Sequence, residues 1–242
     1  MRVEGMTKAE ALAALQDWTG PVSIDQQQDV ASRTALAKDI WLAAHSIVGT
    51  IGERYLSETR GIDTDKLPIT IGDALRFHPR CVFGARAVHP CIIALMRDPV
   101  TAVPVGIHRI GLTMENGTIR KLDRMALGRM GVVMLWPMNG SDRLVIGEGI
   151  ETVLAAATRI TFENAPLIPA WSAVARGGLG RLPVLPRVER LILLVDNDEN
   201  GEGQRAAEQC RRVWKAAGRI TVPLIPKQRG WDFNDVVFGR KT

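Results

Sequence analysis

Strand-like and helix-like segments alternate from Arg143 onward, and this alternation constrains the fold more than any other feature of the chain. Short apolar runs rich in branched residues are typical of buried strands, and longer runs with apolar residues at helical spacing are typical of helices. When the two alternate, the strands form a mostly parallel sheet that helices cover. The sequence predicts strands at 143–147, 165–171, 189–196 and 219–225, and helices at 149–160 and 201–218.

Acidic residues follow three of these predicted strands. Ligand sites in α/β sheets form outside the carboxyl ends of the strands, so these acids are expected to meet at one edge. Carboxylates brought together repel one another unless a cation lies among them, and oxygen ligands without Cys or His favour Mg²⁺. A simpler interpretation is that each acid only caps a helix or closes a turn. The acids are Glu148, Asp196, Asp198, Asp232 and Asp235.

The segments around these acids resemble the Toprim family. GEGIET follows the first strand, DNDENG follows the third, and DFND follows the last. Bacterial-type primases, topoisomerases, some nucleases and recombination proteins share this fold, which is Rossmann-like with a mostly parallel sheet and flanking helices. The resemblance implies that Glu148 acts in acid–base chemistry and that Asp196 and Asp198 hold Mg²⁺, for which Mn²⁺ can substitute.

The resemblance also points to residues around the central three. A later D-x-D pattern of bacterial primases maps to Asp232 and Asn234, which makes Asp232 a further metal ligand. The family carries an acid four residues after the catalytic Glu, where this chain has Thr152, with Glu151 one residue earlier. Glu151, Asn234 and Asp235 are therefore additional candidates for the site.

The stretch 76–129 is basic. It contains nine Lys or Arg and three acids, a net charge of +6, whereas the whole chain has +5. An ordinary solvated surface explains such a stretch as well as a nucleic-acid partner does. Strand-like runs at 91–97 and 104–112 flank the turn-prone Asp98-Pro99, and a third run at 132–136 follows a basic linker. This section resembles the segment before Toprim in primase-like proteins of phages, plasmids and integrated mobile elements.

The N-terminal segment is expected to be helical. Thr7–Trp18 forms an amphipathic pattern with a capping residue, and 28–60 continues at helical spacing. We therefore expect a helical N-terminal segment at 1–67, a small basic mixed α+β subdomain at 68–140 and the α/β domain at 141–242. Three cysteines without a CxxC pair argue against a disulfide framework and favour a reducing cytoplasm, and no apolar run approaches the length of a membrane span.

These features lead to a functional hypothesis with two alternatives. The first is a Mg²⁺-dependent primase-like nucleotidyltransferase that joins ribonucleoside triphosphates on single-stranded DNA, with a helicase or another replication protein as partner. Arg109, Lys121 and Arg124 are the candidates for binding nucleic-acid or nucleotide phosphates. The alternatives are a non-catalytic nucleic-acid-binding module that acts with a partner protein, and a Toprim nuclease. The chain has no Walker A motif, so ATPase or helicase activity within it is not expected.

Overall fold

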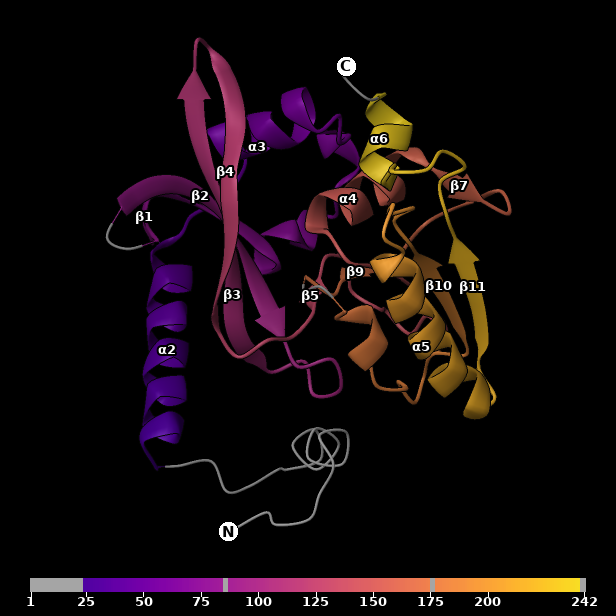
Figure 1. Cartoon of the computed structure of the whole chain (residues 1–242). Helices are drawn as coiled ribbons and strands as arrows, with labels where there is room; N and C mark the ends of the chain where they lie inside the picture. The colour runs from indigo at the N-terminus through magenta and orange to yellow at the C-terminus, as the bar shows by residue number, and fades with distance from the viewer. Residues whose placement is uncertain (1–23, 85–86, 175–176, 240–242) are drawn as a thin grey trace, which may run out of the picture.

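The computed structural model describes residues 24–84, 87–174 and 177–239. Figure 1 shows two larger β-sheets beside one another, one antiparallel and one mostly parallel, with helices on their outer faces and between them. The helix expected at Thr7–Trp18 lies outside the described residues. Among the helices of the described ranges, none is both long enough and apolar enough to cross a bilayer.

The helix expected over 28–60 is interrupted. Residues 44–50 leave the helical conformation because His45 pairs with the first strand, donating to Phe77 O at 2.9 Å and accepting from Phe77 N at 2.8 Å. Gly49 then turns the chain with a φ of 75°, and Thr50 caps the next helix. The elements before the first sheet are α2 (Ile24–Ala43), α3 (Ile51–Arg54), the π-helical turn η1 (Tyr55–Thr59), η2 (Thr64–Lys66) and η3 (Ile69–Asp73).

The first sheet has four antiparallel strands in sequence order, β1-β2-β3-β4. Its second strand is buried on both faces, which explains the unbroken apolar run at 91–96. The stretch expected to be a basic linker is an edge strand instead, in which only Ile119 and Leu127 are buried and the basic residues stay at the surface. The strands are β1 (Leu75–Phe83), β2 (Ala87–Arg97), β3 (Pro104–Glu115) and β4 (Thr118–Gly128).

The second sheet confirms the predicted α/β class. Its order is β11-β10-β6-β9-β5, with β5 antiparallel to β9 and the other neighbouring strands parallel. Of the run at 132–136, which was expected in the middle subdomain, Val133–Met134 join this sheet, whereas Val132 pairs with Arg97 of β2. The strand expected at 165–171 divides, since β8 pairs with β7 and only β9 joins the sheet. The strands are β5 (Val133–Met134), β6 (Arg143–Gly147), β7 (Thr161–Phe162), β8 (Ala165–Pro166), β9 (Ala170–Ser172), β10 (Arg190–Leu194) and β11 (Ile220–Leu224).

Helices cover both faces of the second sheet. On one face α5 contributes the fully buried Trp214 and Cys210. On the other face α4 is buried at every residue except Arg159. The sheet covers one side of α4, and the elements of residues 24–128, called the N-terminal part below, cover the other side. The helical elements of this part are α4 (Ile150–Arg159), η4 (Leu179–Arg181), α5 (Glu202–Ala216) and α6 (Phe233–Phe238).

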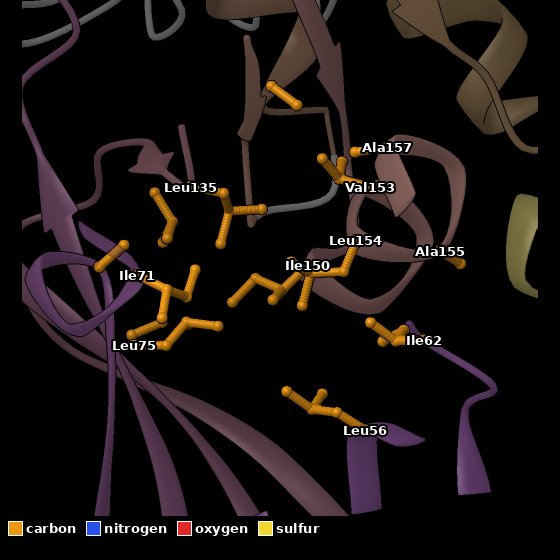
Figure 2. Packing of buried hydrophobic residues seen from close by; sticks show 14 of the residues in the cluster. Leu56, Ile62, Ile71, Leu75, Leu135, Ile150, Val153, Leu154, Ala155 and Ala157 are labelled. Atoms are coloured by element: carbon orange, nitrogen blue, oxygen red, sulfur yellow. The ribbon is translucent and has the colours of Figure 1, made fainter. Parts of the chain in front are cut away.

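One hydrophobic core joins the two sheets. Figure 2 shows Leu56 and Leu75 of the N-terminal part facing Ile150 and Leu154 of α4, with Leu135 of the connecting segment beside them. A second cluster lies between α2 and the first sheet, and a third between α5 and the second sheet. The position of any group on the N-terminal part is therefore fixed relative to the second sheet by shared packing.

Candidate functional site

The carboxyl ends of β6 and β10 are level with each other. Gly147 pairs with Leu194 in parallel register, so the residues that follow both strands emerge at one edge of the sheet. A Cβ on Gly147 would lie 2.8 Å from Val153 Cγ2, so only glycine fits where the chain turns into α4. The carbonyl of Glu148 accepts hydrogen bonds from Ser172 Oγ at 2.8 Å and Val174 N at 2.9 Å, which fixes Glu148 at the end of β6.

The loop after β10 presents Asp196 and Asp198 at the same edge. Asp198 Oδ2 accepts a hydrogen bond from Gly203 N at 3.1 Å in the first turn of α5. The capping interpretation of this acid is therefore correct for one of its oxygens. A Cβ on Gly203 would lie 3.0 Å from Asp198 Oδ2 and 3.3 Å from the carbonyl of Asp196, so glycine allows the loop to approach the helix.

Asn197 ties this loop to the segment that carries the third acid. Its Nδ2 donates to the carbonyls of Pro226 at 2.9 Å and Gln228 at 3.1 Å. Its backbone N–H donates to the carbonyl of Trp231 at 2.9 Å. Asp232 follows directly, so this network holds it beside the Asp196 loop although no strand ends there.

Asp232 begins α6 through a reciprocal capping box with Asp235. Asp232 Oδ1 accepts from Asp235 N at 2.8 Å, and Asp235 Oδ2 accepts from Asp232 N at 3.1 Å. Asn234 is buried and donates its side-chain amide to the carbonyl of Arg60. The structure thus brings Asp232 to the cavity described next, whereas Asn234 and Asp235 hold the backbone around it and do not line it.

A cavity of about 270 Å³ opens where these residues meet. Its charged lining is divided by origin, since all the acids come from the C-terminal part and all the bases from the N-terminal part. Six acids face three bases, so acidic groups are in excess in the cavity lining, which favours a cation. The acids are Glu148, Glu151, Asp196, Asp198, Glu202 and Asp232, and the bases are Arg60, Lys121 and Arg124.

The central acids Asp196 and Asp232 lie in an environment that disfavours their charged forms. Burial raises the pKa of Asp196 to about 7, and the carboxylates of Asp232, Asp198 and Glu148 add to the shift. Burial also raises the pKa of Asp232. In addition, Asp196 Oδ1 is buried and has no hydrogen-bond partner. A buried, unpartnered acceptor among repelling carboxylates is the environment that a bound cation would relieve.

The carboxylates of the cavity suit a hard cation, although they do not enclose it on all sides. Among the described residues, no three Asp, Glu, His or Cys side chains lie close enough together to enclose a metal ion by themselves. Mg²⁺ usually keeps several of its waters and is bound through one or two carboxylates, so widely spaced acids suit it. The oxygen-only set of Asp196, Asp198 and Asp232 is thus compatible with Mg²⁺ and unsuited to zinc.

Glu151 has partners of its own. Its side chain is buried, accepts a hydrogen bond from Tyr55 Oη, and lies 3.2 and 3.3 Å from Lys121 Nζ. Burial opposes its ionisation, but Lys121 and Arg60 outweigh this and hold the pKa of Glu151 below its ordinary value. Burial and the Glu151 charge raise the pKa of Tyr55, so Tyr55 stays a donor. The acid from α4 therefore links the N-terminal part to the C-terminal part.

The three predicted phosphate-binding residues do not lie together. Lys121 and Arg124 of β4 line the cavity. Arg109 does not, because it lies on the opposite face of β3, where its Nη1 donates to Val82 O at 2.6 Å and its guanidinium lies over the ring of Phe83. Neighbouring residues of a strand point to opposite faces, and this one faces the α2 side of the sheet.

Arg60 lines the cavity and was missed in the sequence. It lies outside the basic stretch 76–129, and its only local signal is its place before Gly61 at a helix end. Many surface arginines occupy such positions, so this signal does not distinguish it. Its role becomes visible only when the N-terminal part is packed against α4.

Fold and site together define an α/β protein with an acidic centre at the carboxyl edge of its parallel sheet. Comparison with known families agrees with this class. Residues 143–240 match the family model described as Toprim domain, and residues 31–133 match a domain of unknown function, DUF7146. No curated protein sequence matches the chain. The chain thus carries a Toprim domain, which implies a function related to nucleic acids, and Toprim domains typically bind Mg²⁺ through acidic residues.

Proposed function

We propose that the protein is a Mg²⁺-dependent, primase-like nucleotidyltransferase that makes RNA primers on single-stranded DNA in the replication of a mobile element. The observation that carries this proposal is the division of charge in the cavity. Acids at the sheet edge suit a divalent cation, and bases on the opposite wall suit the phosphates of a nucleotide or a template strand. A site that only bound metal would need the acids alone.

The residues have separate roles in this proposal. Asp196, Asp198 and Asp232 would hold Mg²⁺, which when bound neutralises the triphosphate and polarises the phosphorus under attack. Glu148, which the network at its carbonyl fixes at the end of β6, accepts the proton of the attacking hydroxyl as the new phosphodiester bond forms and pyrophosphate leaves the α-phosphorus. Arg124 is exposed on the edge strand β4 and faces the acids, so it can reach a phosphate that bridges both walls.

Primer synthesis tests the proposal directly. The assay supplies labelled ribonucleoside triphosphates, single-stranded DNA of mixed sequence and Mg²⁺ or Mn²⁺. The wild type is expected to make short oligonucleotides, and an Asp196→Asn/Asp198→Asn variant is expected to make none. Adding a replicative helicase tests for a partner that raises the yield. Shortened template in place of new product would identify a nuclease, and no product on any template would refute primase activity.

One observation favours a second candidate, a nucleic-acid-binding module without catalysis. The position at which primases carry a further acid is Thr152, which is buried. Such a module would bind single-stranded DNA with an affinity that falls steeply with salt. It also predicts that Glu148→Gln leaves the biological effect intact, whereas a nucleotidyltransferase would lose it.

A further inference from the structure

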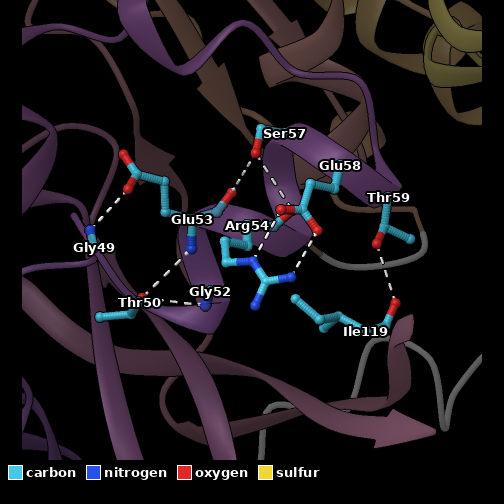
Figure 3. Close-up of polar contacts among 9 residues, drawn as sticks. All are labelled: Gly49, Thr50, Gly52, Glu53, Arg54, Ser57, Glu58, Thr59 and Ile119. Carbon is cyan, nitrogen blue, oxygen red and sulfur yellow. Dashed lines mark hydrogen bonds and ion pairs between the residues drawn. The ribbon is translucent and has the colours of Figure 1, made fainter. Parts of the chain in front are cut away.

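The segment that carries Arg60 is held rigidly at both ends. Figure 3 shows Thr50 accepting hydrogen bonds from the backbone of α3, at 3.1 Å from Gly52 N and 3.4 Å from Glu53 N. At the other end Thr59 Oγ1 donates to the carbonyl of Ile119 in β4 at 3.0 Å. The π-helical turn between them is therefore fastened to the same strand that supplies Lys121 and Arg124.

The backbone of Arg60 itself is fixed from the C-terminal part. Asn234 of α6 donates its side-chain amide to the carbonyl of Arg60. The next residue, Gly61, has a φ of 64°, and a Cβ there would collide with the ring of Phe238, also of α6. Two contacts with one helix thus set the direction in which the Arg60 side chain leaves the chain.

The guanidinium of Arg60 lies near two carboxylates but donates no hydrogen bond to either of them. Its Nε lies 3.6 Å from Glu151 Oε1 and its Nη2 lies 4.0 Å from Asp232 Oδ2, both beyond hydrogen-bond distance. The Nε is also buried and has no hydrogen-bond partner. A buried donor left unpaired is costly, so this position gains from a ligand that brings an acceptor oxygen.

Glu151 does not need Arg60 to be satisfied. Tyr55 and Lys121 both donate hydrogen bonds to its carboxylate, whereas Arg60 contributes only its charge from a longer distance. Lys121 donates hydrogen bonds to both carboxylate oxygens of Glu151, whereas the Arg60 donors lie beyond hydrogen-bond distance of Glu151 and Asp232, although both side chains are partly exposed at the cavity wall. Of the two cations beside Glu151, Arg60 is the one with a buried donor that has no partner, so it gains more from a ligand that brings an acceptor.

We propose that Arg60 binds a phosphate group of a nucleoside triphosphate in this cavity, and that Glu151 and Tyr55 are positioning residues that hold it there. The planar guanidinium offers two parallel N–H groups to phosphate oxygens, which a lysine ammonium cannot do. The proposal deepens the proposed function, on which its substrate class rests. It also gives the region that matches a domain of unknown function a direct part in ligand binding.

Calorimetric titration with ATP, without DNA, tests the role of Arg60. It is performed with Mg²⁺ and again with EDTA, on the wild type, Arg60→Gln and Arg60→Lys. Arg60→Gln is expected to weaken ATP binding by about ten- to a hundred-fold, as for loss of a charged hydrogen bond, and Arg60→Lys is expected to restore part of it. The matched control is Arg54→Gln, because Arg54 is a nearby exposed arginine paired with Glu58 outside the cavity.

A double-variant comparison tests the positioning residues. Tyr55→Phe is expected to weaken ATP binding in the wild-type background and to have little effect when Arg60 is already Gln, because it acts through that side chain. Equal effects in both backgrounds would show a merely structural role for Tyr55. Far-ultraviolet circular dichroism confirms that each variant is folded.

The outcomes separate this inference from the proposed function. Normal ATP affinity of Arg60→Gln, an equal loss in Arg54→Gln, or a wild type that binds no ATP would each overturn the inference. A wild type that binds ATP through Arg60 and yet makes no primer would overturn primase activity and leave the inference standing.

Discussion

Replacing Asp196 with Asn should stabilise the metal-free protein. The folded protein holds the pKa of Asp196 at about 7, against an ordinary value of 3.8, because burial and three neighbouring carboxylates disfavour its charge. The difference is about three pH units, and each unit corresponds to about 1.4 kcal/mol, which sets an upper limit of about 4 kcal/mol. Asn keeps the shape of the side chain and removes the charge.

The gain should depend on pH in a defined window. A carboxyl whose pKa is raised on folding does not lower the free energy of unfolding below pH 3.8, where it is protonated in both states. The free energy of unfolding falls as the pH rises from 3.8 to about 7, because the unfolded chain ionises first. The free energy of unfolding in EDTA should therefore differ by about 1–2 kcal/mol between variant and wild type at pH 5, and by up to about 4 kcal/mol at pH 8. Urea titrations monitored by tryptophan fluorescence measure both values.

Mg²⁺ should reverse the order of stability. If Asp196 helps to hold the cation, saturating Mg²⁺ stabilises the wild type through binding and stabilises Asp196→Asn less. The reasoning is refuted if Asp196→Asn is no more stable than the wild type in EDTA at pH 8, since burial and the neighbouring carboxylates would then not disfavour the charge of Asp196 as the structure implies. Equal stabilisation of both proteins by Mg²⁺ would place the cation elsewhere.

Three further changes probe the surroundings of the site. Gly203→Ala places a Cβ 3.0 Å from Asp198 Oδ2 and should lower the free energy of unfolding by about 1–3 kcal/mol and weaken Mg²⁺ binding, both measurable by thermal denaturation with and without the metal. Trp214→Ala removes a fully buried side chain and should cost about 3–5 kcal/mol in urea titration; a loss below 1 kcal/mol would contradict its packing. Burial, with Arg124 nearby, lowers the pKa of His108 to about 4 from 6.5. The protein should therefore lose about 2 kcal/mol of stability through this group between pH 7.5 and pH 5, where the unfolded chain binds a proton and the folded protein does not, and His108→Leu should remove that part of the loss.

The parts of the fold that the sequence predicted are those with strong local patterns. Strands β6 and β10 appear where they were predicted because each buries a continuous apolar run, and helix α5 does so because it buries one face. Strand β11 and helix α4 also appear where they were predicted, although β11 is only partly buried and α4 is buried on nearly all sides. Strand β4 was missed because an edge strand buries few residues and its polar sequence shows little alternation. Strand β9 has three residues, too few for any periodicity to appear.

The acidic half of the site was predictable and the basic half was only partly so. Acids after parallel strands meet at one edge by geometry, so Glu148 and Asp196 could be placed from the sequence. Whether Arg109 or His108 faces the second sheet could not be decided, because β3 is buried on both faces and gives no polar side to read. Arg60 depends on contacts such as that between Tyr55 and Glu151, which are 96 positions apart.

The structure argues that the two matched regions form one functional unit. Lys121 and Tyr55 from the first region satisfy the buried charge of Glu151 in the second, and a buried carboxylate without such partners is strongly destabilising. The apolar face of α4 likewise packs against Leu56 and Leu75 of the first region. A Toprim domain separated from that region would therefore expose the apolar residues of α4 and lose the bases that line its cavity, so the proposed binding of phosphate requires both regions.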